Sequence, residues 1–192
     1  WQALEFMSLI GSGAGAIGAG FPFMCNGANL AFRKEFFSDF NQNIASGDDV
    51  FLMHLIKKNG GKIVFVKEDS SLITTSAKSS LSSFMSQRKR WASKSSSYTD
   101  KHALVISFVV FFANISLLLS VVLGDYVLFL GLLLLKVIAD YPFLKKLSVF
   151  FGMQRQLRYF WVLQLIYPLY IIYVAIVAQI TTFEWKGRKY SK

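Results

Sequence analysis

A chain of 192 residues has room for one domain and an appendage, but 54% of its residues are hydrophobic, too many for an ordinary soluble domain of this length. Only 17% are charged, against about 25% in typical globular proteins. The single cysteine, Cys25, excludes a disulfide framework and a cysteine metal cluster within the chain. The net charge of +10 is accompanied by no recognised nucleic-acid-binding motif, so no nucleic acid is expected as a partner.

The charges are distributed unevenly along the chain. Residues 1–102 contain 12 Lys/Arg and 8 Asp/Glu, whereas residues 103–192 contain only 9 and 3. We therefore divide the chain into a first region, residues 1–100, and an apolar second region, residues 101–192. The basic residues of the second region lie between long apolar stretches, where membrane lipid headgroups are their expected partners.

The first region alternates helical and strand-like patterns. Helices are predicted over four segments: 2–10, 34–40, 48–58 and 80–97. Short apolar runs predict strands over 21–25, 62–66 and 72–75. Because helices and strands alternate, the predicted fold class is α/β, although the strands are too few for a complete sheet.

Gly13, Gly15 and Gly18 match the pattern G-x-G-x-x-G. A dinucleotide site requires a strand before this pattern and a helix that begins within it. Here helical spacing precedes the glycines and Gly20-Phe-Pro22 follows them. We therefore interpret the segment as a small-residue loop that allows close backbone packing or mobility.

The second region contains two stretches that are long and apolar enough to cross a bilayer as helices. Both 103–124 and 159–183 lack charged residues. Between them, 126–144 is apolar except for Lys136 and Asp140, which are four residues apart and would share a helix face. This middle segment is either a third span or partly interfacial, so two to three transmembrane helices are predicted.

Basic residues give conflicting signals about the topology of these helices. Lys145, Lys146, Arg155 and Arg158 mark the loop before the last helix as cytoplasmic. Three straight spans would then place the tail 184–192 outside, yet this tail carries four positive charges. A re-entrant or interfacial segment would resolve the conflict.

Three segments of the first region carry the side chains of a possible active site: 23–29 (FMCNGAN), 47–52 (GDDVFL) and 87–91 (QRKRW). Each segment alone is weak evidence for an active site. Paired aspartates at a helix start are usually caps, and a basic stretch beside a membrane is usually a lipid-facing anchor. On a helix, however, Gln87, Arg90 and Trp91 share one face. A guanidinium group binds phosphate oxygens, and an indole ring offers an apolar face to a sugar.

Together these segments resemble the family 2 glycosyltransferases of GT-A fold, particularly the membrane-bound synthases of cellulose, hyaluronan and chitin type. Residues 48–52 (DDVFL) are similar to the family's E-D-x-x-L element with Asp in place of Glu, and 87–91 match Q-x-x-R-W. Residues 25–27 (CNG) resemble, less closely, a Cys-Gly-Ser segment at the acceptor site. The resemblance implies that residues 1–100 are the acceptor-side, C-terminal half of a GT-A catalytic domain, followed by a transmembrane anchor at 101–192.

The resemblance also implies an inverting, hexosyltransferase-type reaction that moves a sugar from a nucleotide sugar to a hydroxyl group of a saccharide or lipid acceptor. Asp49 would be the general base, with Asp48 beside it. Arg90, or alternatively Arg88, would stabilise the leaving diphosphate. The acceptor would contact five residues: Gln87, Trp91, Cys25, Asn26 and Gly27.

The chain lacks the Asp-x-Asp element through which the family binds nucleotide and metal. We therefore expect that the donor-binding half lies upstream, that this fragment is inactive alone, and that Mg or Mn binds the intact enzyme through a motif absent from this chain. His54 and His102 have no ligand-spaced partners. The expected location is the cytoplasmic (inner or plasma) membrane, with the catalytic part on its cytoplasmic face. The competing hypothesis is a non-catalytic membrane scaffold or degenerate subunit.

Overall fold

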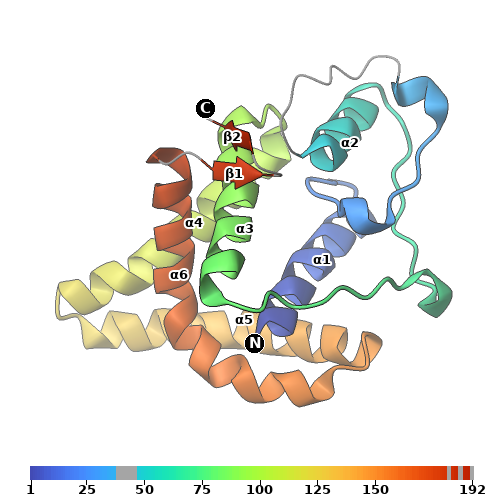
Figure 1. The fold of residues 1–192 in the computed structure, drawn as a ribbon. Helices are drawn as coiled ribbons and strands as arrows, with labels where there is room; N and C mark the ends of the chain where they lie inside the picture. Colours follow the sequence, from blue (N-terminus) through green and yellow to red (C-terminus); the bar gives the residue numbers. More distant parts are fainter. Residues whose placement is uncertain (38–46, 181–182, 186–187, 191–192) are drawn as a thin grey trace.

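The computed structural model describes residues 1–37, 47–180, 183–185 and 188–190 (Figure 1). Six α-helices make up most of this part of the chain: α1 (Gln2–Gly18), α2 (Asp48–Lys58), α3 (Leu81–Ala92), α4 (Lys101–Val122), α5 (Tyr126–Phe150) and α6 (Phe160–Ile180). Five short 3-10 helices connect them: η1 (Gly27–Asn29), η2 (Lys34–Phe37), η3 (Asp69–Ser71), η4 (Ser93–Ser97) and η5 (Gln154–Tyr159). Strands β1 (Phe183–Trp185) and β2 (Arg188–Tyr190) form an antiparallel pair with Phe183 opposite Tyr190.

The predicted α/β class is wrong. Over the described ranges the only strands are β1 and β2, and the predicted strands at 21–25, 62–66 and 72–75 are not formed. A strand persists only where a neighbour satisfies its backbone hydrogen bonds and covers its apolar side chains. Instead, the side chains of Val64, Val66 and Ile73 are 65%, 55% and 58% exposed. The fold is helical, and the sheet expected for half of a GT-A domain is not formed over the described residues.

The helices predicted in the first region are largely confirmed. Helix α2 spans 48–58 as predicted, with acidic residues in its first turn and lysines in its last, which suits the helix dipole. The segment 80–97 forms α3 and then η4; Ser80 caps α3 by accepting a hydrogen bond from the backbone N–H of Ser83 at 3.1 Å. The helix predicted over 34–40 is η2 at 34–37, and its last three residues lie outside the described part.

The glycine-rich segment is helical, so its interpretation as a loop is wrong. Helix α1 continues through the glycines to Gly18. A Cβ atom on Gly11 would overlap the side chain of Leu147 on α5, and one on Gly13 would lie 3.0 Å from the carbonyl oxygen of Met24. The missing side chains therefore let α1 approach its neighbours closely.

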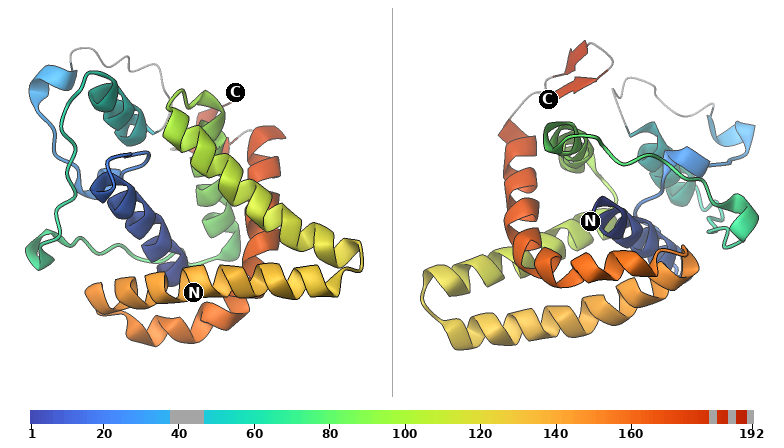
Figure 2. Two further views of the ribbon diagram at one scale, coloured as in Figure 1. Left: turned by 180° about the vertical axis from the view of Figure 1, so that it is seen from behind. Right: turned by 60° about the horizontal axis from the view of Figure 1, so that its bottom comes forward.

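Packing crosses the compositional boundary near residue 100. Leu4 and Met7 of α1 form one buried cluster with Leu144 of α5 and Phe160 of α6. Helix α3 packs along α6, and α4 contacts both α5 and α6 (Figure 2). The first region is thus built onto the long helices and shares their core.

Helices α4 and α5, and η5 joined to α6, are long and apolar enough to cross a membrane. Their apolar side chains are mostly exposed; Val122, Val127 and Ile180 are 79%, 84% and 75% exposed. Exposed apolar surface of this extent is typical of helices that face lipid. These are the features of a membrane protein.

The third of these helices is not straight. Both views of Figure 2 show that α6 begins alongside α5 and then turns sharply to run beside α3. Pro168 lies inside α6, where it removes a backbone donor and disfavours a straight helix. The bend brings the two halves of α6 into contact with different parts of the molecule.

We expect the chain, expressed in bacteria, to stay in the membrane pellet through alkaline carbonate washing, because lipid covers the exposed surfaces of α4–α6. Immunoblots of pellet and supernatant provide the measurement, with a peripheral membrane protein as control. Release of the chain together with that control would show that these helices are buried in a protein assembly.

Candidate active site

Asp49 lies against part of the predicted site, the loop that carries Cys25, Asn26 and Gly27. It lies in the first turn of α2 after Gly47, whose φ of +93° favours glycine. The Asp49 Oδ2 atom accepts a hydrogen bond from the backbone N–H of Gly27 at 2.9 Å, and Oδ1 accepts one from the N–H of Val50 at 2.9 Å. A Cβ atom on Gly27 would lie 3.0 Å from Oδ2, so a glycine permits this approach. The neighbouring Asp48 is exposed.

The loop that carries Cys25, Asn26 and Gly27 is held against α2. The Asn26 side chain accepts a hydrogen bond from the N–H of Ala28 at 3.0 Å and caps η1. Burial, and then the charge of Asp49, raise the pKa of Cys25 to about 12. The thiol is therefore protonated at neutral pH, which disfavours a nucleophilic role.

His54 and Lys57 fasten the start of this loop to α2. The His54 ring nitrogen Nε2 lies 2.9 Å from the carbonyl oxygen of Phe23, and Lys57 donates to the carbonyl oxygen of Pro22 at 2.7 Å. Lys57 also pairs with Asp100 at 2.6 Å. Burial opposes ionisation of Asp100, but hydrogen bonds from Lys57 and from the N–H of Ala103 outweigh it and lower the pKa of this carboxyl group. These residues connect the site to the first turn of α4.

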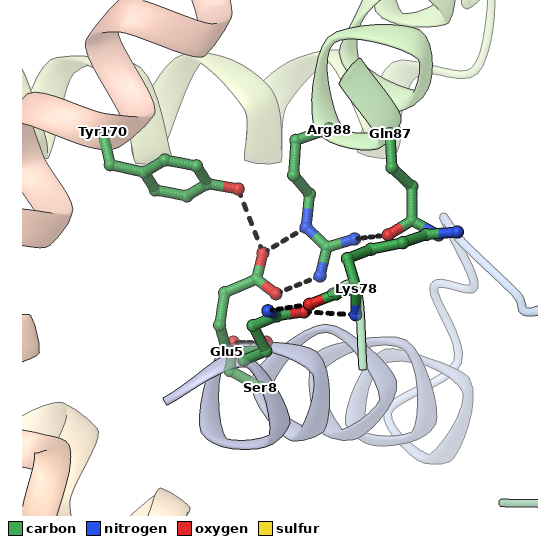
Figure 3. A network of polar contacts seen from close by, with 7 residues as sticks. Glu5, Ser8, Lys78, Gln87, Arg88 and Tyr170 are labelled. Carbon is green, nitrogen blue, oxygen red and sulfur yellow. Dashed lines mark hydrogen bonds and ion pairs between the residues drawn. The ribbon is translucent and has the colours of Figure 1, made fainter. Parts of the chain in front are cut away.

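Arg88 of the Q-x-x-R-W segment lies in a buried polar network with Glu5 (Figure 3). Its guanidinium group donates two hydrogen bonds to the Glu5 carboxylate, one of them at 2.8 Å, and a third to the Gln87 side chain at 2.9 Å. Tyr170 on α6 donates to the same carboxylate at 3.2 Å. The network joins α1, α3 and α6, and both charged partners are buried.

Trp91 lies with Arg88 at the junction of α1 and α3. The Arg88 guanidinium carbon is 4.2 Å from the centre of the Trp91 ring and 4.6 Å from that of Phe84. The centres of the Phe6 and Trp91 rings are 6.1 Å apart. The structure thus brings Gln87 and Trp91 together with Arg88.

Arg90, in contrast, is affected by the charge of Asp49. Burial lowers the pKa of Arg90, while the charge of Asp49 opposes this shift. Two residues of a helix are about 200° apart around its axis, so Arg88 and Arg90 point to different sides. The charge of Asp49 acts on Arg90, whereas Arg88 is bound to Glu5.

Lys94 and Tyr98 also lie near Asp49, and sequence reasoning did not single them out. Lys94 lies four residues beyond Arg90, a spacing that places both on one helix face and could have identified it. Tyr98 packs against Phe51 and His54, with ring centres 5.7 and 5.5 Å apart. Burial, and then the charge of Asp49, raise the pKa of Tyr98 to about 12. No sequence signal identifies Tyr98.

Asp48 and Asp49 are the two neighbouring carboxylates of the candidate site. Over the residues that the structure describes, no three His, Cys, Asp or Glu side chains come close enough to hold an ion. Asp48 and Asp49 therefore have no third ligand of these types in that part of the chain.

The family described as Glycosyl transferase family group 2 matches residues 1–182. The chain therefore belongs to this family of glycosyltransferases, which confirms the resemblance to the family 2 glycosyltransferases. The match includes both the site residues and the apolar helices α4–α6. No curated protein and no solved structure matches the chain.

We expect Arg88→Met to lower the melting temperature of the detergent-solubilised protein by several degrees. The substitution leaves the buried Glu5 carboxylate without its counter-charge, a loss of about 3–5 kcal/mol. The double variant Glu5→Gln, Arg88→Met should recover part of this loss. Arg33→Met is the control, because Arg33 and Glu35 form an exposed pair. Equal melting temperatures for Arg88→Met and Arg33→Met would contradict a stabilising role for the buried pair.

Proposed function

We propose that the chain is the acceptor-side part of an inverting, hexosyltransferase-type glycosyltransferase that acts at a membrane. The intact enzyme moves a sugar from a nucleotide sugar to a hydroxyl group of a saccharide or lipid acceptor, as in the synthesis of a polysaccharide or glycolipid. The observation that carries this proposal is the position of Asp49, held by the Gly27 N–H and close to the charge of Arg90, in a chain of the glycosyltransferase family.

Asp49 is the general base in this proposal. Its carboxylate takes the proton of the acceptor hydroxyl group while the hydroxyl oxygen forms a bond to the anomeric carbon of the donor sugar. The bond from that carbon to the diphosphate oxygen breaks, and its electron pair leaves with the diphosphate. Each Asp49 oxygen already accepts one backbone N–H, and a carboxylate has about four lone-pair sites, so acceptor positions remain.

Arg90 stabilises the negative charge that develops on the leaving diphosphate. We assign this role to Arg90 because the Arg88 guanidinium group is already bound to Glu5 and Gln87. Trp91 presents an apolar ring to the acceptor from a position fixed by Arg88. Residues 25–27, together with Gln87, form the remaining acceptor contacts.

The nucleoside part of the donor and a divalent Mg or Mn ion bind another part of the intact enzyme, whereas the diphosphate reaches Arg90. The described acidic residues do not gather into a metal cluster, and the chain has no Asp-x-Asp element. The chain alone is therefore inactive in this proposal. A non-catalytic scaffold remains the competing function, and it predicts that neither Asp49 nor Arg90 affects sugar transfer.

The membrane is the cytoplasmic one, with the site on its cytoplasmic face, and only α4 and α5 cross it completely. Both flanks of α6 lie against first-region helices, since η5 packs on α1 and β1 packs on α3. A straight span would separate its ends by about 30 Å. The bend in α6 turns its second half beside α3 (Figure 2), and in this proposal the chain thereby stays on the side on which α6 entered. The basic tail and the basic loop at 145–158 then share the cytoplasmic side, which satisfies the positive-inside rule.

Reporter fusions test this topology. A green fluorescent protein fused after Lys192 should fluoresce in bacteria, and alkaline phosphatase fused there should be inactive, because the tail faces the cytoplasm. The matched control is a fusion within the α4–α5 turn at Gly124, which should give the opposite pattern. Active phosphatase after Lys192 would show that α6 crosses the membrane.

Asp49→Asn tests the assignment of the base. It preserves shape but removes basicity, so turnover of the intact enzyme should fall by about 10²–10⁴-fold. Asp48→Asn is the matched control: Asp48 occupies the same helical turn but is exposed. Both variants should retain the melting temperature and membrane insertion of the parent enzyme.

Near-normal turnover in Asp49→Asn at unchanged stability would refute the assignment. A severe loss only in Asp48→Asn would move the base by one residue. If the parent enzyme transfers sugar from none of a panel of UDP- and GDP-sugars, the scaffold function is favoured.

A further inference from the structure

The side chain of Lys94, on η4, lies over the first residues of α2. A Cβ atom on Gly47 would be 2.5 Å from Lys94 Cδ and 2.9 Å from Lys94 Nζ. Gly47 directly precedes Asp48 and Asp49, and it is buried. The absence of a side chain at position 47 is therefore what lets the ammonium group reach the start of α2.

The surroundings of Lys94 shift its pKa in opposite directions. Burial lowers the pKa of Lys94; the charges of Asp49 and Asp48 oppose this shift, and that of Arg90 adds to it. A cation at the N-terminal end of a helix is also unfavourable, because this end carries partial positive charge. Among the atoms that the structure describes, the ammonium group has no hydrogen-bond acceptor. Its three N–H groups can therefore donate to a ligand.

Lys94 and Arg90 together place two cations near the proposed base. Both side chains interact with the charge of Asp49, and they lie one helical turn apart along the chain. Each cation favours negative charge at this point. An anionic group of the substrate would relieve the repulsion between them, whereas a neutral sugar ring would not.

We propose that Lys94 is a second substrate-binding cation, whose ammonium group binds, together with Arg90, the phosphate oxygens of the nucleoside diphosphate that leaves during sugar transfer. This inference rests on the proposed glycosyltransferase reaction. As the bond between the anomeric carbon and the diphosphate oxygen breaks, the electron pair stays on the diphosphate. The acceptor proton goes to Asp49, and the added negative charge lies between Arg90 and Lys94. A lysine serves here as a compact, flexible point charge.

The test compares Lys94→Met with Lys94→Arg in the intact enzyme. The methionine variant keeps an unbranched side chain of similar length but removes the charge. It should lower kcat/KM for the donor by about 10²-fold, the usual effect of losing one donor to a developing negative charge. It should also raise the inhibition constant of the nucleoside diphosphate that matches the active donor, UDP or GDP, about tenfold. Lys94→Arg should restore most of both values, because it restores the charge.

Lys58→Met is the matched control, since Lys58 is exposed at the far end of α2 and loses the same charge. Its kinetic constants should be those of the parent enzyme. Lys94→Gln provides a second variant if the methionine variant does not fold, with the melting temperature as the criterion. Loss of kcat with an unchanged inhibition constant for the nucleoside diphosphate would overturn the proposal. Lys94 would then have only a structural role, packing over the turn at Gly47.

This outcome is distinguishable from failure of the proposed function. If the parent enzyme is active and Asp49→Asn is inactive, but Lys94→Met behaves as the parent, only the role of Lys94 is wrong. If the parent enzyme transfers sugar from none of the UDP- and GDP-sugars, the proposed reaction and the role of Lys94 are both overturned.

Discussion

The buried pair between Glu5 and Arg88 is the interaction on which the arrangement of the first region depends. It joins α1 to α3, and the Tyr170 hydroxyl group connects both to α6. Two charges removed from water are stabilised only when they satisfy each other, so the pair admits few relative positions of these helices. The Q-x-x-R-W helix is thereby oriented by a contact that involves no substrate.

This orientation of α3 gives some motif residues a structural role and leaves others available for the proposed reaction. Because Arg88 points inward, Arg90 points to another side of α3, where the charge of Asp49 acts on it. Trp91 and Gln87 are held by Arg88, whereas Lys94 extends beyond the helix to cover Gly47. The membrane helices contribute directly, since the bent α6 supports α3 along its length and supplies Tyr170. Anchor and site thus share one packed unit.

Much of the local structure was predictable, and the fold class was not. The boundaries of α2 follow from local signals, namely acidic residues at its start, lysines at its end and Asn59-Gly60 after it. The apolar helices follow from length and composition. The apolar runs at 62–66 and 72–75 suggested strands, but strand formation depends on a partner segment, which periodicity in one segment does not report. The glycines of α1 suggested a loop for a related reason. The helix there packs against Leu147 and Met24, and these contacts come from segments that the local pattern does not report.

By itself, the sequence determined the glycosyltransferase motifs, their order, the three apolar helices and the side chains available at the site. These properties depend on residue type and on spacing within a few turns. Only the tertiary structure decided which arginine lies near Asp49, that Gly27 donates to Asp49, and that Lys94 covers Gly47. It also decided the bend that returns α6 to α3. The physical reason is that these contacts join distant segments, and their geometry is set by the packing of whole helices against one another.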